Sequence, residues 1–204
     1  MPAGHRWTAR SQLRNADAAV ASYRRGSAVI AEGDLTYDLP EGTEAPGRIA
    51  GRCVGHRIEI DAPPELVWDF VADFEGWSGW NPLYVETAGR AEVDGQIRFA
   101  VLLEGLKPQK GSARVVTVRP TECLEYMMSS FGGLVKAFRF VEIEEISPTR
   151  CIVTNGEIMG GAMGGVIAKV MGRKIGKGLA GMNDALKRMA ELKWSGRPVD
   201  GRTS

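Results

Sequence analysis

The chain of 204 residues carries 26 Lys and Arg against 25 Asp and Glu, and 44% of its residues are hydrophobic. This length and composition exclude a disordered chain and favour one globular domain with a full core plus additional sequence. The net charge of +1 gives no electrostatic signature of nucleic-acid binding, and no apolar run approaches the ~18 residues of a membrane-spanning helix, so we expect neither a nucleic-acid partner nor stable membrane insertion.

The N-terminal segment, residues 1–51, differs in pattern from the rest of the chain. Apolar residues recur at helical spacing over residues 10–25 and stop at Gly26, which predicts a short amphipathic helix. Residues 27–51 mix short apolar patches with Gly and Pro, so we expect irregular chain there. The segment is interpreted as an extension that docks on the domain or on a partner, a homodimer contact included, with a flexible tail as the alternative. It lacks the uninterrupted apolar core of a secretory signal, which favours a cytoplasmic location.

A strand and two short helices are predicted next. Apolar and polar residues alternate from Arg52 onward, which is typical of a half-buried strand. Pro63 and Pro64 then open a helix with apolar residues on one side, and Gly76 and Gly79 interrupt the helical region that follows. We therefore predict a short helical pair directly after the first strand.

Six further strands are predicted from segments rich in β-branched and aromatic residues, namely 83–92, 96–104, 112–118, 124–130, 135–146 and 151–158. Short turns separate these segments, so the strands should form an antiparallel meander that curls as the sheet twists. The last long segment, Gly160 to Leu192, has an apolar stripe rich in Met and Gly at helical spacing. This helix is expected to lie across the concave face of the sheet, because no other large apolar surface is available to it.

The predicted fold class is therefore α+β, with a curved antiparallel sheet of about seven strands wrapped around one long C-terminal helix. The main domain is expected to span residues 52–192, between the extension of residues 1–51 and a C-terminal tail of residues 193–204. A helix face rich in Met and Gly is soft and locally thin. It can line a cavity as easily as it can fill a core, and the periodicity leaves both open.

The segment from Ile60 to Pro82, IDAPPELVWDFVADFEGWSGWNP, resembles the opening of START-like proteins, also called the helix-grip or SRPBCC group. The likeness is strongest to the polyketide cyclase/dehydrase-like bacterial subgroup, whose last strand and closing helix resemble residues 155–161 and 178–191. The resemblance implies the helix-grip fold and a cavity for a hydrophobic small molecule, such as a lipid-like, polyketide or aromatic compound. It implies no single reaction, and the His that relatives often carry at the position of Phe138 is absent here.

Three polar residues are candidates for acid/base chemistry in such a cavity. His56 shares strand parity with Val54, so its imidazole should point inward and act as a base or satisfy a neighbouring group. Glu157 should also point inward, either to transfer a proton or to cap the first turn of the long helix. Tyr126 would polarise a ligand carbonyl group.

A larger set of mostly apolar residues is predicted to line the cavity, because its members share one face of a strand or of the long helix. These residues are Trp80, Phe99, Val101, Leu103, Tyr126, Met128, Phe138, Phe140, Met163, Ile167, Val170 and Met171. Trp80 lies in a Gly-containing bend and is either a lid or an anchor. The alternative for the whole set is a filled core made of the same side chains.

No metal or cofactor is expected. Cys53, Cys123 and Cys151 are far apart and are interpreted as reduced thiols, and the chain has only two His residues to serve as metal ligands. The basic residues of the long helix are interpreted as a solvated face, with weak attraction to an anionic membrane as the alternative.

The function that we predict is binding or transport of a hydrophobic small molecule in the internal cavity. The alternative is an enzyme, a polyketide cyclase, dehydratase or aromatase that uses acid/base groups in the same cavity. A third hypothesis is an interaction module in which the extension mediates dimerisation or docking and the cavity has no ligand.

Overall fold

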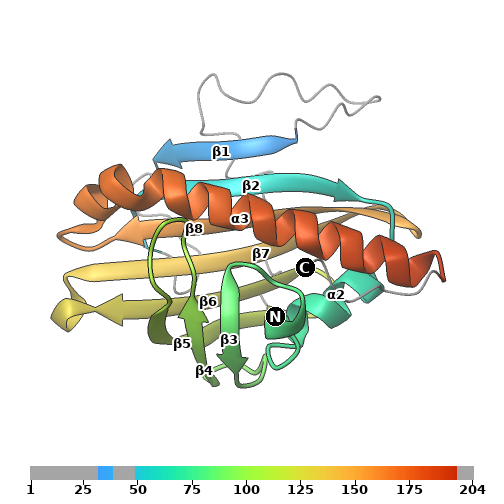
Figure 1. Cartoon of the computed structure of the whole chain (residues 1–204), viewed down its shortest axis with the longest axis horizontal. Coiled ribbons are helices and arrows are strands. Elements are labelled where there is room, and N and C mark those ends of the chain that lie inside the picture. The colour runs from blue at the N-terminus through green and yellow to red at the C-terminus, as the bar shows by residue number, and fades with distance from the viewer. Residues whose placement is uncertain (1–31, 39–48, 197–204) are drawn as a thin grey trace, which may run out of the picture.

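The computed structural model of the chain describes residues 32–38 and 49–196 (Figure 1). The predicted helix over residues 10–25 lies outside the described residues, and so does most of the extension that would form the homodimer contact. Within the described part, the chain forms one eight-stranded antiparallel sheet and two α-helices.

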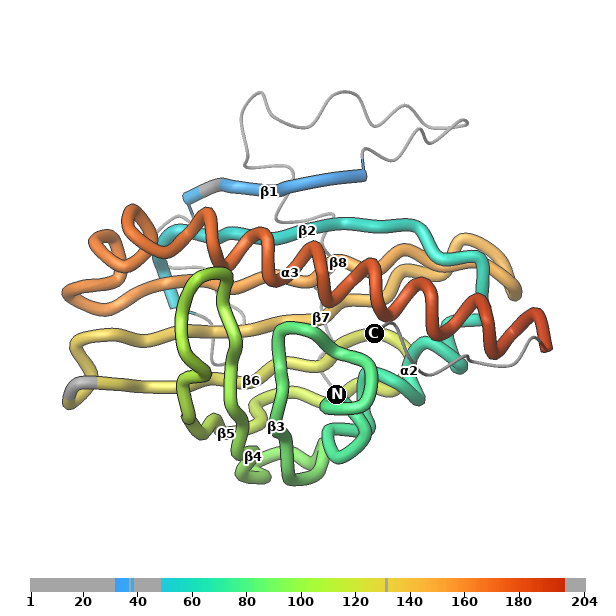
Figure 2. The backbone as a smooth tube through the Cα atoms, in the orientation of Figure 1, coloured from blue at the N-terminus to red at the C-terminus, as the bar shows by residue number. Residues whose placement is uncertain are grey.

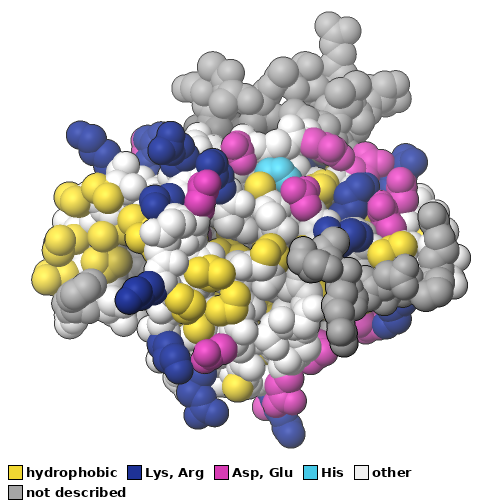
Figure 3. Space-filling model, in the orientation of Figure 1, with side chains coloured by type: hydrophobic (Ala, Val, Ile, Leu, Met, Phe, Trp, Pro, Cys, Tyr) yellow, Lys and Arg dark blue, Asp and Glu magenta, His cyan; other side chains and the backbone are white. Residues whose placement is uncertain are grey.

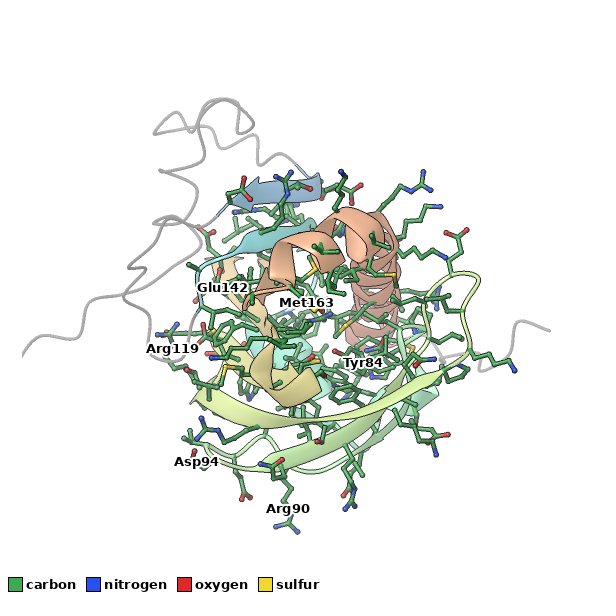
Figure 4. All side chains as sticks on the ribbon, turned by 90° about the vertical axis from the view of Figure 1, so that its left-hand side faces the viewer. Tyr84, Arg90, Asp94, Arg119, Glu142 and Met163 are labelled. Atoms are coloured by element: carbon green, nitrogen blue, oxygen red, sulfur yellow. The ribbon has the colours of Figure 1, made fainter. Side chains whose placement is uncertain are left out.

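The sheet follows the order β1-β2-β8-β7-β6-β5-β4-β3, which places the first long strand beside the last one. Its strands are β1 (Gly33–Asp38), β2 (Arg52–Ile60), β3 (Tyr84–Ala88), β4 (Gln96–Val101), β5 (Gln109–Arg119), β6 (Cys123–Ser130), β7 (Val135–Ser147) and β8 (Arg150–Gly160). The sheet curves around the C-terminal helix in both views of the ribbon (Figures 1 and 4). The predicted antiparallel sheet wrapped around one helix is thereby confirmed.

β1 is a strand that the sequence does not predict. Residues 33–38 pair antiparallel with β2, and the Arg52 guanidinium lies 3.2 Å from the Asp38 carboxylate across this pair. A strand of six residues carries too few side chains for a clear alternation, and its pairing comes from the free edge that β2 offers. β1 accounts for the eighth strand, beyond the seven expected.

The helical pair consists of α2 (Pro64–Ala72) and the 3₁₀ turn η1 (Trp77–Gly79). Pro64 starts α2, where its missing N–H costs nothing. Trp77 Nε1 donates to the Phe70 carbonyl oxygen at 3.0 Å, and this carbonyl lies in the last turn of α2, where no helical donor is available. The Trp77 side chain therefore fixes η1 against the end of α2.

The long helix α3 (Gly164–Trp194) lies along the concave face of the sheet (Figure 2). It begins four residues later than Gly160, because β8 continues to that residue. A Cβ atom at Gly172 or Gly176 would lie only 3.5 or 3.2 Å from the methyl groups of Val54, so these glycines let the helix approach β2 closely. Neither described helix is long and apolar enough to cross a membrane.

Two groups of buried apolar side chains lie on the two faces of the sheet. The larger group is the helix-side core, in which Val54, Tyr126 and Val141 pack with α2 and α3. The smaller group is the outer-face cluster of Cys53, Phe138, Phe140 and Ile158. Strand alternation separates the two groups, since neighbouring residues of one strand point to opposite faces.

Candidate ligand-binding site

A row of three polar side chains crosses the concave face. Tyr126 on β6 stands directly opposite Arg139 on β7, and Arg139 stands directly opposite Glu157 on β8. Directly opposite residues of an antiparallel pair share one face of the sheet, so the three side chains point together toward α3. Arg139 is only 1% exposed, which places a cation in the interior of the protein.

Two tyrosines meet next to this cation. The hydroxyl groups of Tyr84 and Tyr126 are 2.9 Å apart, and the Arg139 guanidinium carbon lies 5.5 Å from the centre of the Tyr84 ring. Burial raises the pKa of Tyr84 and of Tyr126, so both hydroxyls stay neutral at physiological pH. Neutral hydroxyls can donate as well as accept a hydrogen bond. This pair can therefore bind a ligand oxygen that accepts a hydrogen bond or one that donates it.

The Arg139 guanidinium is partly paired. One terminal nitrogen donates to Asn155 Oδ1 at 2.9 Å, and the other lies 3.5 Å from Glu157 Oε2. The Nε–H is buried and has no hydrogen-bond partner among the described residues. Burial disfavours the charged guanidinium, but Tyr126, Tyr84 and Glu157 outweigh this effect and hold the pKa of Arg139 above its ordinary value. The group therefore remains a cation whose Nε–H has no partner among the described residues.

A chain of amides links this cation to the helix and to β2. Asn155 Nδ2 donates to Asn183 Oδ1 on α3 at 3.3 Å. Asn183 Nδ2 in turn donates to the His56 carbonyl oxygen at 3.0 Å and lies 3.2 Å from His56 Nδ1. His56 thus faces the helix as its strand parity indicates, but it reaches Arg139 only through two amides.

Glu157 is the member of the row that solvent can still reach, because its side chain is 14% exposed whereas that of Arg139 is 1% exposed. Burial raises the pKa of the Glu157 carboxyl above its ordinary value of 4.5, although Arg139 opposes this shift. The capping role that the sequence allows for Glu157 is wrong, since the N-cap of α3 is Met163 and no side chain caps this end.

The raised pKa predicts a pH-dependent stability difference between the wild type and the Glu157→Gln variant. A carboxyl group whose pKa rises on folding stabilises the fold below its unfolded value, and this contribution is lost as the pH rises through the folded value. As the pH rises from about 4.5, the free energy of unfolding of the wild type should therefore fall relative to that of the variant. Urea unfolding across a pH series measures the difference.

Glu104→Gln is the control for this measurement. A hydrogen bond from Lys177 lowers the pKa of the exposed Glu104 carboxyl, so its pH slope should have the opposite sign. A wild type that gains stability over Glu157→Gln as the pH rises would contradict the assigned direction and show that the Arg139 charge dominates at Glu157.

Aromatic side chains fill the inner part of the space between sheet and helix. Trp77, Phe74, Tyr84 and Tyr126 are at most 2% exposed. The ring centres of Trp77 and Tyr84 are 5.1 Å apart, and those of Phe74 and Tyr126 are 5.9 Å apart. This end of the site is a packed wall, as the alternative of a filled core predicts. Trp80 is half-buried beside it, 6.3 Å from Trp77 between ring centres.

Partly buried apolar side chains line the same space toward the N-terminal half of α3, and we call this part the open end. Its side chains are only partly buried while they pack on the helix-side core, and they are Val101, Leu103, Met128, Ile167 and Met171. Met163 and Val170, which the sequence places in the lining, are 41% and 68% exposed. They lie at the rim, because the helical stripe turns outward over the first turns of α3.

The prediction that Phe138 and Phe140 line the cavity is wrong. The sequence pattern places them in the lining, whereas both belong to the outer-face cluster on the other side of the sheet. Arg139, between them, takes the inward position. Phe99 lies on the helix side as expected, and it packs at 5.5 Å from Tyr84 between ring centres.

Two other features of the molecule do not contribute to this site. A pocket of about 280 Å³ lies along the last turns of α3, and its mainly apolar walls are formed by the aliphatic parts of Asp184, Lys187, Arg188, Glu191 and Leu192. On the outer face, the ligand atoms of Cys123, Glu125 and Glu142 lie within 4.8 Å of one another. Each of these three residues already has an interaction of its own, so we assign no metal site to them. Figure 4 shows Glu142 on the far side of the sheet from Tyr84.

A curved antiparallel sheet that holds one long C-terminal helix, with polar side chains buried between the two, defines a helix-grip protein. The chain belongs to the family described as "Polyketide cyclase / dehydrase and lipid transport", whose model matches residues 51–191. The family assignment expected from the resemblance is thereby confirmed. None of the curated proteins matches this sequence.

Solved structures of similar fold include enzymes and a START protein. The Zhui aromatase/cyclase from Streptomyces sp. R1128 is 16% identical with a TM-score of 0.60, over 74% of this chain and 99% of that one. A START superfamily protein from Mycobacterium smegmatis is 21% identical with a TM-score of 0.53, over 69% and 98%. Norcoclaurine synthase from Thalictrum flavum, solved with dopamine and hydroxybenzaldehyde, is 15% identical with a TM-score of 0.52, over 67% and 84%. At these identities the likeness shows the fold.

Proposed function

We propose that the protein binds a hydrophobic small molecule whose polar end accepts a hydrogen bond from Arg139. The observation that carries this proposal is the buried Arg139 Nε, which has no partner among the described residues. An unpaired buried donor costs roughly 1–3 kcal/mol, and a ligand oxygen would recover this cost. Lipid-like, polyketide and aromatic compounds with a carbonyl, carboxylate or phenol oxygen fit this requirement.

The ligand has to enter through the open end, because aromatic rings fill the inner part of the space. It must displace partly buried side chains there, and Met171 and Met128 are suited to this because the unbranched thioether chain changes rotamer easily. Burial of the apolar body then contributes about 25 cal/mol per Å² of area removed from water. Arg139 and the tyrosine pair orient the polar end.

The similar structures support an aromatic or polyketide-like ligand. One is an aromatase/cyclase, and another was solved with dopamine and hydroxybenzaldehyde, two small aromatic molecules. The family description names both cyclisation and lipid transport. The family therefore supports a hydrophobic small molecule without choosing between carriage and turnover.

The second candidate function is a cyclase, dehydratase or aromatase activity at the same site. The observation that favours it is Glu157, a partly exposed carboxyl group 3.5 Å from the Arg139 guanidinium, whose pKa is raised by burial, the direction that suits a general acid. The neutral hydroxyls of Tyr84 and Tyr126 lie on the other side of Arg139 and could polarise a ligand carbonyl. His56 contributes to this set only through Asn183 and Asn155.

The proposed location is the cytoplasm. Cys53, Cys123 and Cys151 are buried, and none of them forms a disulfide bond. Reducing compartments keep thiols in this state, so the three cysteines support the proposal.

Titration with anilinonaphthalene sulfonate, an aromatic anion that fluoresces in apolar surroundings, tests the binding proposal. We expect saturable binding with a Kd of roughly micromolar order. Met171→Trp, which fills the open end, should weaken binding by about tenfold or more, which is about 1.4 kcal/mol. Val93→Trp is the matched control, because Val93 is 59% exposed on the loop between β3 and β4. Equal affinity of the wild type and Met171→Trp would contradict entry through the open end.

Native mass spectrometry of the protein purified from its source separates carriage from turnover. A co-purifying apolar compound that stays unchanged on incubation supports binding, and a chemically altered one supports catalysis. In the second case Glu157→Gln should keep its affinity for anilinonaphthalene sulfonate and lose the conversion. Retained conversion in this variant would reject Glu157 as the acid/base group.

A further inference from the structure

Six large apolar side chains are exposed around the open end, and we call them the apolar rim. They come from the loop after β4, the turn after β6 and the first turns of α3, and they are Leu102, Leu106, Leu134, Met163, Val166 and Val170. Their exposed fractions run from 38% to 68%. Figure 3 shows hydrophobic side chains gathered at the left end of the molecule, where the first turns of α3 lie in Figure 1. Exposed apolar groups gathered in this way mark an interaction surface.

The rim segments are held against one another by hydrogen bonds. The Met163 amide donates to the Leu134 carbonyl oxygen at 3.0 Å, which joins the turn after β6 to the start of α3. Lys174 Nζ donates to the Glu104 carbonyl oxygen at 2.7 Å, which joins the loop after β4 to the same helix. The rim is therefore one ordered surface on three segments.

Basic residues flank the rim along the first half of α3. The part of α3 from Gly164 to Lys177 carries four basic residues, Lys169, Arg173, Lys174 and Lys177, and no acidic one. Glu104 pairs with Lys177 at 2.8 Å, and the other three basic residues form no ion pair with a carboxylate of the described residues. The remainder of α3 mixes both signs, with Asp184 and Glu191 present. The half of the helix that carries the rim is therefore the half that has basic residues and no acidic ones.

We propose that the apolar rim and the basic half of α3 form a docking surface for an anionic lipid bilayer. Apolar side chains flanked by Lys and Arg on one helix are suited to the boundary between lipid headgroups and acyl chains, because the long basic side chains reach anionic headgroups while the apolar ones enter the acyl region. Docking in this orientation places the open end against the bilayer. The surface does not depend on the ligand of the interior, since none of the Arg139 contacts takes part in it.

Co-sedimentation of the full chain with lipid vesicles tests the proposal. Binding to phosphatidylcholine vesicles that contain phosphatidylglycerol should exceed binding to pure phosphatidylcholine vesicles by about tenfold or more, and it should weaken as salt is added. Lys169→Glu combined with Arg173→Glu should abolish this preference. Val166→Ser combined with Val170→Ser should weaken binding to the anionic vesicles by about tenfold. All four positions are exposed, and thermal melting checks that each variant folds.

Two controls distinguish docking through the rim from nonspecific adsorption and from ligand binding in the interior. Val93→Ser removes an equally exposed valine from the loop that carries Arg90 and Asp94, which lies far from Met163 in Figure 4, and should leave vesicle binding unchanged. Anilinonaphthalene sulfonate affinity should survive the Val166→Ser and Val170→Ser changes, so failure of docking and failure of ligand binding are distinguishable. Equal binding to both kinds of vesicle, or a rim that is instead buried by concentration-dependent self-association, would overturn the proposal.

Discussion

Replacement of Arg139 by methionine is expected to lower the affinity for anilinonaphthalene sulfonate by about tenfold or more and the free energy of unfolding by about 3 kcal/mol. The affinity falls because the variant loses the unpaired Nε–H that we assign to the ligand. The stability falls because Glu157 and Asn155 lose the cation to which they are bonded, and an uncompensated buried charge is costly. Methionine keeps most of the volume of the side chain, so cavity formation contributes little.

A double-mutant cycle separates the charge from the packing. Arg139→Met combined with Glu157→Gln removes both partners of the pair, so much of the stability lost in Arg139→Met should return. The affinity for the probe should not return, because the donor is still absent. Urea unfolding and fluorescence titration of all four proteins measure the two effects. Restored affinity in the double variant would mean that the probe does not bind at Arg139.

Arg57 provides a matched control for this cycle. It also lies on an interior strand of the sheet and pairs with a carboxylate, Glu144, at 3.0 Å. Arg57→Met should reduce stability without changing the affinity for the probe, because this pair lies outside the site. Equal loss of affinity in both arginine variants would point to a general effect of destabilisation.

Arg139 is also the residue that sequence reasoning missed, and the cause is physical. Alternation identifies the inward face of a strand only when the other face is exposed to water. All residues of β7 from Ala137 to Ile143 are buried, so both Phe138 and Arg139 fit an interior position. A charged residue between two phenylalanines is then assigned to solvent by default, which reverses the true orientation. One signal in the sequence is that Arg139 is the only cation of the buried stretch from Ala137 to Ile143, and a buried cation needs partners that pair with it.

Prediction of how the other polar side chains of the site are arranged requires the strand register, and a single sequence does not specify it. Tyr126 and Glu157 are inward by parity, but their position on either side of Arg139 depends on which residues of β6, β7 and β8 stand opposite one another. A slip of one residue would separate the row and exchange the two faces. The fold can be predicted without the register, because an alternating segment forms a strand whichever residues stand opposite it. The overall fold is therefore predictable where the site is not.

The apolar period of α3 likewise predicts the helix but not which residues of its stripe are buried. Its apolar period predicts α3 from composition alone, and Leu179, Met182 and Leu186 are fully buried as the period requires. Val170 belongs to the same stripe and is 68% exposed, because the first turns of α3 extend past the edge of the packed core. Periodicity gives the direction of a side chain around the helix axis, but the presence of a partner along the axis depends on the whole fold.

Replacement of Trp77 by alanine is expected to reduce the free energy of unfolding by about 3–5 kcal/mol, the largest effect that we predict for any single change. Trp77 is fully buried, and its ring contacts Phe74 and Tyr84 at 4.7 and 5.1 Å between centres. Alanine would leave a cavity beneath the tyrosine pair and would free η1 from the last turn of α2. Urea unfolding followed by circular dichroism measures the loss.

Trp80→Ala is the informative comparison, because the two tryptophans are neighbours in space and only one is fully buried. Trp80 packs edge-on against Phe70 at 6.3 Å between ring centres and is partly open to solvent, so its loss should cost about 1 kcal/mol. Trp77→Phe should fall between the two alanine variants, since it keeps a ring but cannot donate to the Phe70 carbonyl. Equal losses for Trp77→Ala and Trp80→Ala would mean that the wall around the tyrosine pair is looser than its burial indicates, and an apolar ligand could then reach Arg139 from that side as well.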